Sequence, residues 1–465
     1  MRFLFIFPPG QGFVITDKKV FPPSPYSPPL GILYLSTMLE RNGHTIKVLD
    51  YTAENIDEAK LRGKIDSADA IGMTLCTSSL SESIDLAHLI KKYKPNIPLL
   101  IGGPHCNIVP EKAIIDFNAD ICVTGDGELI ICAIADALQG KGELSNIPGI
   151  YYKDNGKIKQ TMPMQIIKDL DSLPFPARHL VNKYEYGYFI GEKLAPGRTT
   201  SIITTRGCPY HCRFCGYNSI RSKYDERSVE NVIKEIEEII SQGYHSLIIV
   251  DNNFLANKRR AEKIMDKIIE QEIKINIWIM GARVDSAERI LFEKMRNAGV
   301  TFISFGIESG NQDVLDLYNK KTTVQQIIDA INLSKEMGFF TSGSFIIGAP
   351  IETKDHIENT IKFAKSLPLD VAHFLALGYI YGSPLWLKAI EEGKIIPDEY
   401  SVIANSQRNL GMFTEEELKN YCMKAHRSFY FDPRYIIRQL FYAFKNRDFR
   451  FIKAGFKMFT THEIQ

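Results

Sequence analysis

Along roughly the first 140 residues, short hydrophobic runs alternate with stretches in which hydrophobic positions recur with the period of a helix. Short apolar and β-branched runs predict buried strands at 2–7, 45–50, 70–76, 98–102 and 120–124. Stretches with helical periodicity separate them, at 30–42, 56–64, 81–94 and 128–138. Gly43 and Pro95 stand where two of these helices should end. The alternation predicts a doubly wound α/β fold, in which a parallel sheet carries helices on both faces.

A second series of strand and helix patterns begins near Thr200 and repeats about every thirty residues. Its apolar runs predict strands at 201–205, 246–251, 276–281, 301–308, 341–348 and 373–379. Helical stretches such as 229–242 and 323–337 lie between them. Six strand–helix units predict a partial TIM-like (β/α)6 barrel, with its active site at the carboxyl ends of the strands.

Two further stretches complete the expected organisation. Residues 151–161 carry Asp154, Asn155 and Gly156 between alternating runs, which is a hairpin signal, and 171–176 are typical of an extended linker. From about Tyr400 the pattern is helical and rich in aromatic residues. We expect a first domain at 1–145, a hairpin and linker at 146–199, a barrel domain at 200–395 and a helical C-terminal region at 396–465.

Composition narrows the class of protein. The chain has 465 residues, 45% of them hydrophobic, enough for two or three domains, and its net charge of +1 gives no indication of nucleic-acid binding. No run reaches the roughly 18 to 20 apolar residues of a membrane-spanning helix, and the apolar start lacks the features of a signal peptide. Five scattered cysteines (76, 106, 122, 132 and 422) suit free thiols in a reducing compartment. We therefore expect a soluble cytoplasmic protein.

Three further cysteines carry the clearest chemical signal. Cys208, Cys212 and Cys215 lie in the run RGCPYHCRFCGYN, spaced CxxxCxxC, directly after a predicted strand. Thiolates are the usual ligands of iron–sulfur clusters, and the absence of a fourth matching cysteine would leave one iron open to a small molecule. A zinc knuckle and a chance spacing are the alternatives. Zinc sites usually pair CxxC with a second CxxC or a histidine pair, and His211 cannot easily complete a tetrahedron.

This spacing, with the aromatic Phe214 before the third cysteine, resembles the signature of the radical S-adenosylmethionine (SAM) superfamily. The resemblance implies a four-iron four-sulfur cluster on Cys208, Cys212 and Cys215, with SAM chelating the open iron through its amino and carboxylate groups. Reductive cleavage of SAM would give methionine and a deoxyadenosyl radical. An external low-potential electron donor is then a partner. The protein supplies orientation and exclusion of water.

Polar or glycine-rich groups end four other strands of the second series. A single Asp or Ser at a strand end is usually a cap, but several at one barrel face favour a site. By the same resemblance, Asp251 and Asn252 would bind the SAM amino group, although this chain departs from the family's GGE motif. Glu308 and Ser309 would reach the ribose or the carboxylate with Arg283 nearby, and Gly348 would leave space for adenine. If Glu308 instead caps the helix that starts near Gln312, its role is structural.

The first domain resembles the cobalamin-binding module that precedes the radical domain in many members of that superfamily. Ligands of doubly wound sheets bind beyond the carboxyl strand ends, which indicates loops 8–12, 74–79, 102–106 and 125–128. The resemblance implies a cobalamin site at Leu30, Gly31, Thr74, Ser78, Gly102, Gly103, His105, Gly125, Gly127 and Glu128. The DxHxxG motif that supplies an axial histidine is absent, and His44 is expected at a helix end. The cobalt would then lack a histidine ligand.

The C-terminal region allows two interpretations. Eight Arg or Lys residues stand against two Asp between 427 and 457, and aromatic residues lie among them. This pattern is typical of a basic amphipathic helix pair that contacts membrane lipid or an anionic substrate. It is equally typical of a helical cap that packs its aromatic residues on the barrel.

The resemblance extends over about residues 1–400, to ring cyclases of tetrapyrrole synthesis and to methylases of unactivated carbon. We expect a cobalamin-dependent enzyme that methylates an unactivated carbon of a small-molecule or lipid substrate, through a deoxyadenosyl radical and methylcobalamin. Radical cyclisation or carbon–carbon coupling is the alternative reaction. An iron–sulfur electron carrier or sensor is a further alternative, against which the polar strand ends argue. The sequence singles out no catalytic residue and no substrate.

Overall fold

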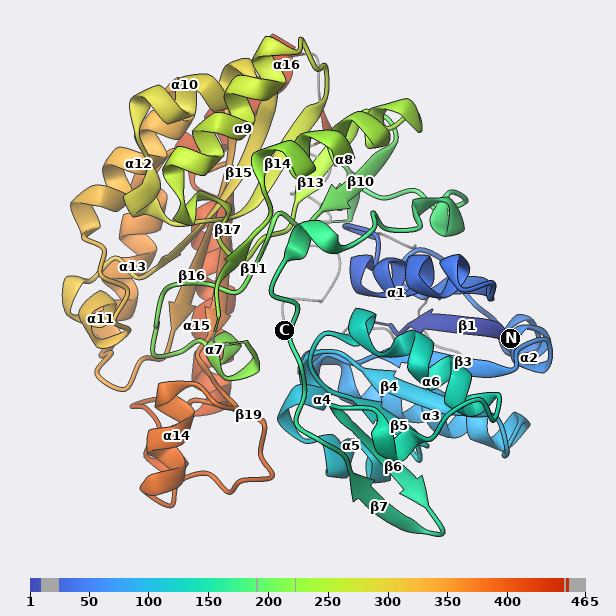
Figure 1. The fold of residues 1–465 in the computed structure, drawn as a ribbon. Helices are drawn as coiled ribbons and strands as arrows, with labels where there is room; N and C mark the ends of the chain where they lie inside the picture. The colour runs from blue at the N-terminus through green and yellow to red at the C-terminus, as the bar shows by residue number, and fades with distance from the viewer. Residues whose placement is uncertain (10–24, 190, 222, 447–448, 451–465) are drawn as a thin grey trace. The chain divides into compact units, whose positions relative to one another are not determined.

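The structure is a computed structural model that describes residues 1–9, 25–189, 191–221, 223–446 and 449–450. The chain forms two compact units, Met1–Tyr186 and Gly187–Gln465, and each is described by itself (Figure 1).

The first unit is built on a seven-stranded sheet with the order β2-β1-β3-β4-β5-β6-β7. Its parallel strands are β1 (Arg2–Phe7), β2 (Thr45–Asp50), β3 (Ala70–Thr74), β4 (Leu99–Gly102) and β5 (Ile121–Val123). The predicted hairpin is β6 (Ile150–Asp154) and β7 (Lys157–Gln160), and it extends the same sheet antiparallel to β5. The order reverses between β1 and β3, so the switch point of the sheet lies there.

Helices cover both faces of this sheet, which confirms the doubly wound prediction. On one face, α1 (Leu30–Arg41) packs against α6 (Ile131–Leu138). A separate buried cluster joins the sheet to α2 (Glu58–Asp66), α3 (Leu80–Tyr93) and α5 (Pro110–Asp116). Sequence analysis missed α5 and the short α4 (Pro104–Ile108), because the proline that opens each of them suggests a turn.

The segment that follows the hairpin is attached to the first unit by tyrosine hydrogen bonds. The Tyr186 hydroxyl donates to Asp50 Oδ2 at 2.9 Å, and the Asp50 N–H donates to the Tyr184 hydroxyl at 3.3 Å. Burial raises the pKa of Asp50 above its usual value. These hydrogen bonds attach the segment around Tyr184 and Tyr186 to Asp50, the last residue of β2.

The second unit is built on a parallel six-stranded sheet with the order β10-β13-β14-β15-β16-β17. Its strands are β10 (Thr199–Ile202), β13 (Ser246–Ile249), β14 (Asn276–Ala282), β15 (Val300–Glu308), β16 (Phe340–Ile347) and β17 (Val371–Ala376). The helices that follow them include α8 (Val229–Ser241), α9 (Lys258–Glu270), α10 (Arg289–Asn297), α12 (Val324–Glu336) and α13 (Lys354–Ser366). These helices share one large apolar core with one face of the sheet (Figure 1). Sequential parallel strands with helices on one face confirm the predicted partial barrel.

The open edge of β17 is closed by helix α15 (Glu415–Tyr430). The Ala372 N–H donates to the Tyr430 hydroxyl at 3.2 Å, and this hydroxyl donates to the Ala372 carbonyl at 3.1 Å. The Phe374 N–H donates to His426 Nε2 at 3.2 Å, while His426 Nδ1 bonds the Cys422 carbonyl at 2.8 Å. Helical side chains thus satisfy backbone groups that an edge strand would otherwise expose.

We expect the second unit to lose stability as the pH falls from 7 to 5. Burial lowers the pKa of His426 and lowers that of His373 to about 4, so the native state binds fewer protons than unfolded histidines, whose pKa is about 6.5. Stability is then fully present above pH 6.5 and decreases below it. His426→Gln keeps an acceptor for Phe374 but does not titrate, so its melting temperature should fall less steeply with pH than that of the wild type. Parallel slopes would contradict this prediction.

Helix α16 (Pro433–Asn446) follows α15. None of the helices in the described ranges is long and apolar enough to cross a bilayer.

Candidate functional site

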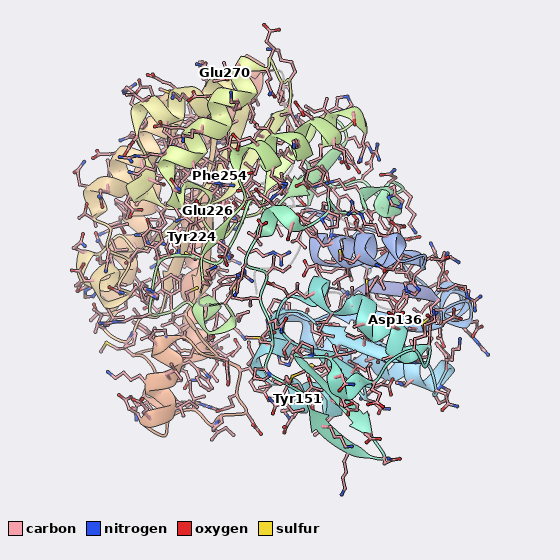
Figure 2. All side chains as sticks on the ribbon, in the orientation of Figure 1. Asp136, Tyr151, Tyr224, Glu226, Phe254 and Glu270 are labelled. Atoms are coloured by element: carbon pink, nitrogen blue, oxygen red, sulfur yellow. The ribbon has the colours of Figure 1, made fainter. Side chains whose placement is uncertain are left out.

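The three predicted cluster cysteines lie on a loop that is closed at its base by a small strand pair. Strand β11 (Thr205–Arg206) precedes the loop and pairs antiparallel with β12 (Asp225–Glu226). Gly207 has φ +95°, and a Cβ there would lie 2.1 Å from the Lys223 carbonyl oxygen, so the turn requires glycine. Near this base, Tyr224 donates to Glu226 at 2.7 Å, and both are labelled in Figure 2. The strand pair fixes where the loop leaves the barrel sheet.

The thiols of this loop suit a cluster better than a single ion. Cys208, Cys212 and Cys215 are all free and half-buried. Burial raises the pKa of Cys212 and Cys215, so a bound metal must displace their protons. Within the described residues, no three His, Cys, Asp or Glu side chains are arranged around a single metal position. A four-iron cluster receives each thiolate on a different iron, and three thiols on one loop fit that requirement.

Glu308, at the end of β15, forms a buried ion pair that sequence analysis did not foresee. Its Oε1 lies 2.5 Å from Lys320 Nζ, and both side chains are buried. Lys320 Nζ also lies 6.0 Å from the ring centre of Phe214 in the cluster loop. The alternative role for Glu308 as a helix cap is wrong, because Asn311 precedes α11 (Gln312–Leu317) and Glu308 bonds Lys320 instead. The pair therefore connects the end of β15 with the cluster loop.

Arg283 joins the cluster loop to the third barrel strand. Its guanidinium donates to both oxygens of Asp285, at 3.0 and 2.9 Å, and to the Lys320 carbonyl at 2.5 Å. It stacks over Tyr210 with 3.8 Å to the ring centre, and its Nη1 lies 3.8 Å from Cys212 Sγ. This places a positive charge beside a cluster thiol, while the two Asp285 bonds leave few donors for a carboxylate ligand.

Asp251, two residues after β13, is turned toward Thr204, which follows β10. Its oxygens accept from the Thr204 N–H at 2.6 Å and from the Thr204 hydroxyl at 2.5 Å. Burial raises the pKa of this carboxyl. The predicted neighbour Asn252 is exposed. The next residue, Asn253, is 2% exposed, and neither atom of its amide has a hydrogen-bond partner among the described residues.

An unpartnered buried amide is costly, so Asn253 suits a residue whose partner is a ligand. It directly follows the predicted pair Asp251 and Asn252, and no role was predicted for it. Its unpartnered amide oxygen is a candidate for the SAM amino group, beside Asp251, whose oxygens are engaged by Thr204.

We expect Asn253→Ala to weaken SAM binding about tenfold, since one hydrogen bond to a charged group is worth roughly 1.5–3 kcal/mol. Its melting temperature should hold or rise, because an unsatisfied buried amide is removed. Equilibrium binding of SAM to the reconstituted protein, with thermal unfolding, measures both. As a matched control, Asn257→Ala removes the cap of α9, whose side chain accepts from Arg260, and should lower stability only. Unchanged affinity in Asn253→Ala would refute the assignment.

The two remaining predicted SAM residues have structural contacts of their own. The Ser309 hydroxyl lies 3.2 Å from Thr360 Oγ1 and accepts from the Asn311 N–H at 3.2 Å. Gly348 has φ +108°, and a Cβ there would meet Leu418 of α15 at 2.9 Å. The SAM roles of both residues remain predictions.

Sequence analysis assigned no role to Glu352. The N–H groups of Gly348 and Ala349 donate to its Oε2 at 2.6 and 2.8 Å, and burial raises its pKa to about 7. The carboxylate thus fixes the turn after β16.

Apart from Leu30 and Gly31, the predicted cobalamin residues of the first unit lie at or just beyond the carboxyl ends of its parallel strands. Leu30 and Gly31 open α1, Thr74 ends β3, and Ser78 belongs to the turn after it. Gly102 ends β4, while Gly125, Gly127 and Glu128 follow β5. Loop 8–12 lies partly outside the described residues.

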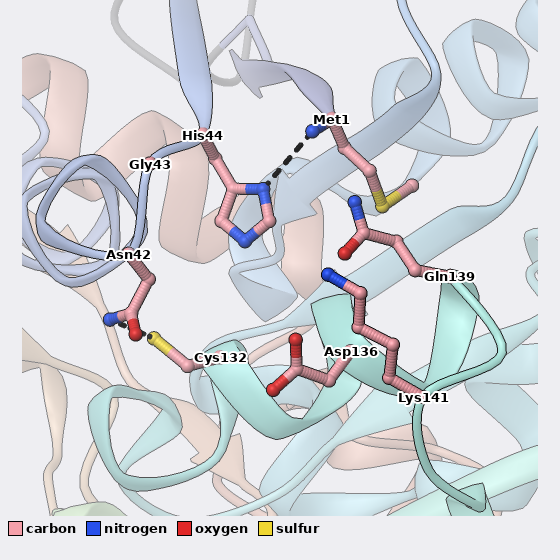
Figure 3. Close-up of a pocket in the computed structure, with 8 residues that line it drawn as sticks. All are labelled: Met1, Asn42, Gly43, His44, Cys132, Asp136, Gln139 and Lys141. Carbon is pink, nitrogen blue, oxygen red and sulfur yellow. Dashed lines mark hydrogen bonds between the residues drawn. The ribbon is translucent and has the colours of Figure 1, made fainter.

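Neither predicted histidine of this unit is placed as a free cobalt ligand. His105 is 1% exposed, and its Nδ1 lies 3.3 Å from the Thr77 hydroxyl. His44 follows the end of α1 as expected, at the amino ends of the strands, beside a hollow of about 170 Å³ (Figure 3). There its Nδ1 lies 3.2 Å from the Met1 amine. These positions fit a cobalamin bound without a histidine ligand from either residue, and the hollow contains none of the predicted site residues.

Comparisons with known proteins agree with both units. Residues 202–364 match the Radical SAM superfamily and residues 23–135 match the B12 binding domain. An uncharacterised methyltransferase of Pyrococcus horikoshii is 33% identical over 451 residues, which cover 95% of each chain. The anaerobic magnesium-protoporphyrin IX monomethyl ester cyclase of Cereibacter sphaeroides is 26% identical over 87% of this chain and 67% of its own.

A solved structure has the same fold. The radical SAM methyltransferase TsrM from Kitasatospora setae, with cobalamin and a [4Fe-4S] cluster bound, superposes with a TM-score of 0.68. It is 19% identical, over 84% of this chain and 75% of that one.

Proposed function

This chain belongs to the radical SAM superfamily, among members with a preceding B12-binding domain, and we propose that it methylates an unactivated carbon of a small-molecule substrate. The observation that carries the proposal is the three-thiol loop at the carboxyl end of a parallel barrel sheet, in a chain that also carries the B12-binding domain. The family's cofactors are a four-iron four-sulfur cluster, SAM and cobalamin. When bound, they supply a radical that removes a hydrogen atom and a methyl group that replaces it.

The described residues have distinct tasks in this proposal. Cys208, Cys212 and Cys215 would hold the cluster. The Arg283 guanidinium lies 3.8 Å from the Cys212 sulfur, while Lys320 Nζ lies 6.0 Å from the centre of the Phe214 ring of the same loop. Charge on thiolates and cluster sulfur is stabilised by such neighbours. Asn253 and Glu308 orient SAM from two different strand ends.

Electrons come from an external low-potential donor, for which the cluster is the entry point.

The test uses SAM whose methyl group carries three deuterium atoms. The reconstituted protein, a strong reductant and a small-molecule extract of the producing cells are incubated without oxygen. We expect a product in which CD₃ has replaced one hydrogen, together with deoxyadenosine. The triple variant of the cluster cysteines is the control and should form neither.

Other products would favour the alternatives. An unlabelled product with a new ring or carbon–carbon bond supports radical cyclisation, in line with the similarity to the cyclase. Failure to cleave SAM at all supports an electron carrier or sensor.

We also propose that this cytoplasmic enzyme contacts membranes peripherally through α16. One face of this helix presents Ile436, Ile437, Leu440, Phe441 and Phe444 to solvent, and three of them are 67–69% exposed. The opposite face is bound to the barrel. The Tyr435 hydroxyl donates to the Asp370 carbonyl at 3.1 Å, and Arg438 to the Leu369 carbonyl at 2.5 Å.

The cap interpretation describes α15, which packs on the barrel, and the exposed apolar face of α16 supports the proposal of a membrane contact. An exposed apolar stripe in a segment with eight basic and two acidic residues suits an anionic lipid surface.

Flotation with vesicles of phosphatidylcholine and phosphatidylglycerol tests this contact. The wild type should float and Phe441→Ser/Phe444→Ser should not, while Ile290→Ser, an exposed apolar residue of α10, should behave as the wild type. Absence of flotation contradicts the proposal. If the double variant instead abolishes a dimer seen in sedimentation, the face binds a second copy.

A further inference from the structure

The face of the barrel sheet that points away from the helices carries its own pattern. Ile303, Phe305 and Phe345 belong to the core beneath the helices. Alternate residues along a strand point to opposite faces, so Ser304, Gly306, Ser342, Ser344 and His373 lie on the inner face. The strand register places Ser304 beside Ser342, and places Gly306, Ser344 and His373 side by side.

Three stacked aromatic rings lie on the same inner face, and those of β15 and β16 come two residues before Ser304 and Ser342 along the strands. Trp278 and Phe302 stack with ring centres 4.9 Å apart, and Phe302 and Phe340 with centres 5.4 Å apart. Phe189 packs edge-on against both Phe302 and His373, at 5.2 and 5.7 Å. These rings come from neighbouring strands in register, so they present one continuous apolar floor.

The row of inner-face residues next to these rings includes a buried hydroxyl without a hydrogen-bond partner. The Ser342 hydroxyl is fully buried and has no partner among the described residues. Ser304, Ser344 and His373 beside it are half-buried. Burial keeps this imidazole neutral at pH 7, since it lowers the pKa to about 4. An unpaired buried hydroxyl costs free energy, so Ser342 suits a residue whose partner is a ligand.

Charges nearby are already paired. A Cβ on Gly306 would lie 2.5 Å from Glu308 Oε1 and 2.9 Å from Lys320 Nζ, so the ion pair lies directly above the row. Its charges neutralise each other, and the row itself carries none. A charged group placed here would lose its hydration without gaining a counter-ion.

We infer that Ser342, Ser344 and His373 form a substrate subsite for an uncharged hydrogen-bonding group, such as an amide, carbonyl or hydroxyl, attached to a flat apolar body that rests on the Phe302 floor. The inference rests on the proposed function, because it specifies what the same barrel accepts. It predicts a substrate that is neutral in the part that enters the barrel, with any charge held elsewhere.

Benzamide tests the subsite, because it combines a flat ring with a neutral amide. Benzoate and benzylammonium are its charged counterparts of similar size. Binding to the reconstituted protein, without SAM or reductant, is measured by ligand-observed NMR titration. We expect a Kd on the order of 1 mM for benzamide, at least fivefold weaker binding of both charged probes, and at least threefold weaker benzamide binding to Ser342→Ala and His373→Phe.

A matched serine separates recognition from folding. Ser334 of α12 is also fully buried, but its hydroxyl donates to the Ala330 carbonyl at 2.8 Å away from the inner face. Ser334→Ala should bind benzamide as the wild type does, and Ser342→Ala should melt no lower than the wild type. Equal binding of benzoate, unchanged binding to Ser342→Ala, or no benzamide binding at millimolar concentration overturns the inference. Methyl transfer plays no part in this measurement, so it can fail while the proposed reaction stands, and the reverse.

Discussion

Replacing Cys208, Cys212 and Cys215 together by alanine abolishes cluster absorbance and all cleavage of SAM. These three thiols are free and are the proposed ligands of the cluster, so without them the loop has no thiolate to offer to iron. The fold should survive, because the loop base is held by β11, β12 and the Gly207 turn rather than by the thiols. Iron and sulfide analysis, together with deoxyadenosine formation under strong reduction, measures the loss.

Cys422→Ala is the matched control for this experiment. Its thiol is buried in α15 and belongs to the apolar core, so the substitution costs some stability but should keep the full iron content. Retention of about four irons per chain in the triple variant would place the ligands elsewhere.

Much of the fold could be predicted because buried parallel strands are nearly continuous apolar runs. β1 and β2 have the predicted bounds, β15 starts one residue earlier than predicted, and β16 is shifted by one residue at both ends. The prediction missed helices where the first residue is of a type that is common both in turns and at helix starts. Pro104 and Pro110 mark turns in most sequences, and here each occupies the first turn of a helix.

The sequence predicted those site residues that can be recognised within one loop or at one strand end, but not the contacts between residues that are distant in the chain. The cysteine loop is visible in the sequence because its ligands are close neighbours in the chain. Lys320 is not, because its importance comes from an ion pair with Glu308, whose position depends on the folded barrel. Asn253 directly follows the predicted pair Asp251 and Asn252, but only burial without a partner distinguishes it from Asn252.

Glu308→Gln is expected to lower both stability and SAM affinity, and the ion pair explains why the two effects must be separated. Glutamine keeps the shape of the side chain but leaves the Lys320 ammonium buried without a counter-ion. Loss of one partner from a buried pair costs about 3–5 kcal/mol. Loss of a carboxylate that accepts ribose hydroxyl groups costs roughly 1.5–3 kcal/mol, a tenfold to hundredfold weaker affinity.

A second substitution separates the two effects. Lys320→Met keeps most of the side-chain length and removes the charge, so Glu308→Gln/Lys320→Met has no unpaired ion. Its melting temperature should return close to that of the wild type. Its affinity for SAM should stay tenfold to hundredfold weak, because the ribose still lacks its carboxylate, and the iron content should be unchanged. If the double variant regains both properties, Glu308 acts only as the counter-ion of Lys320, and another residue must bind the ribose.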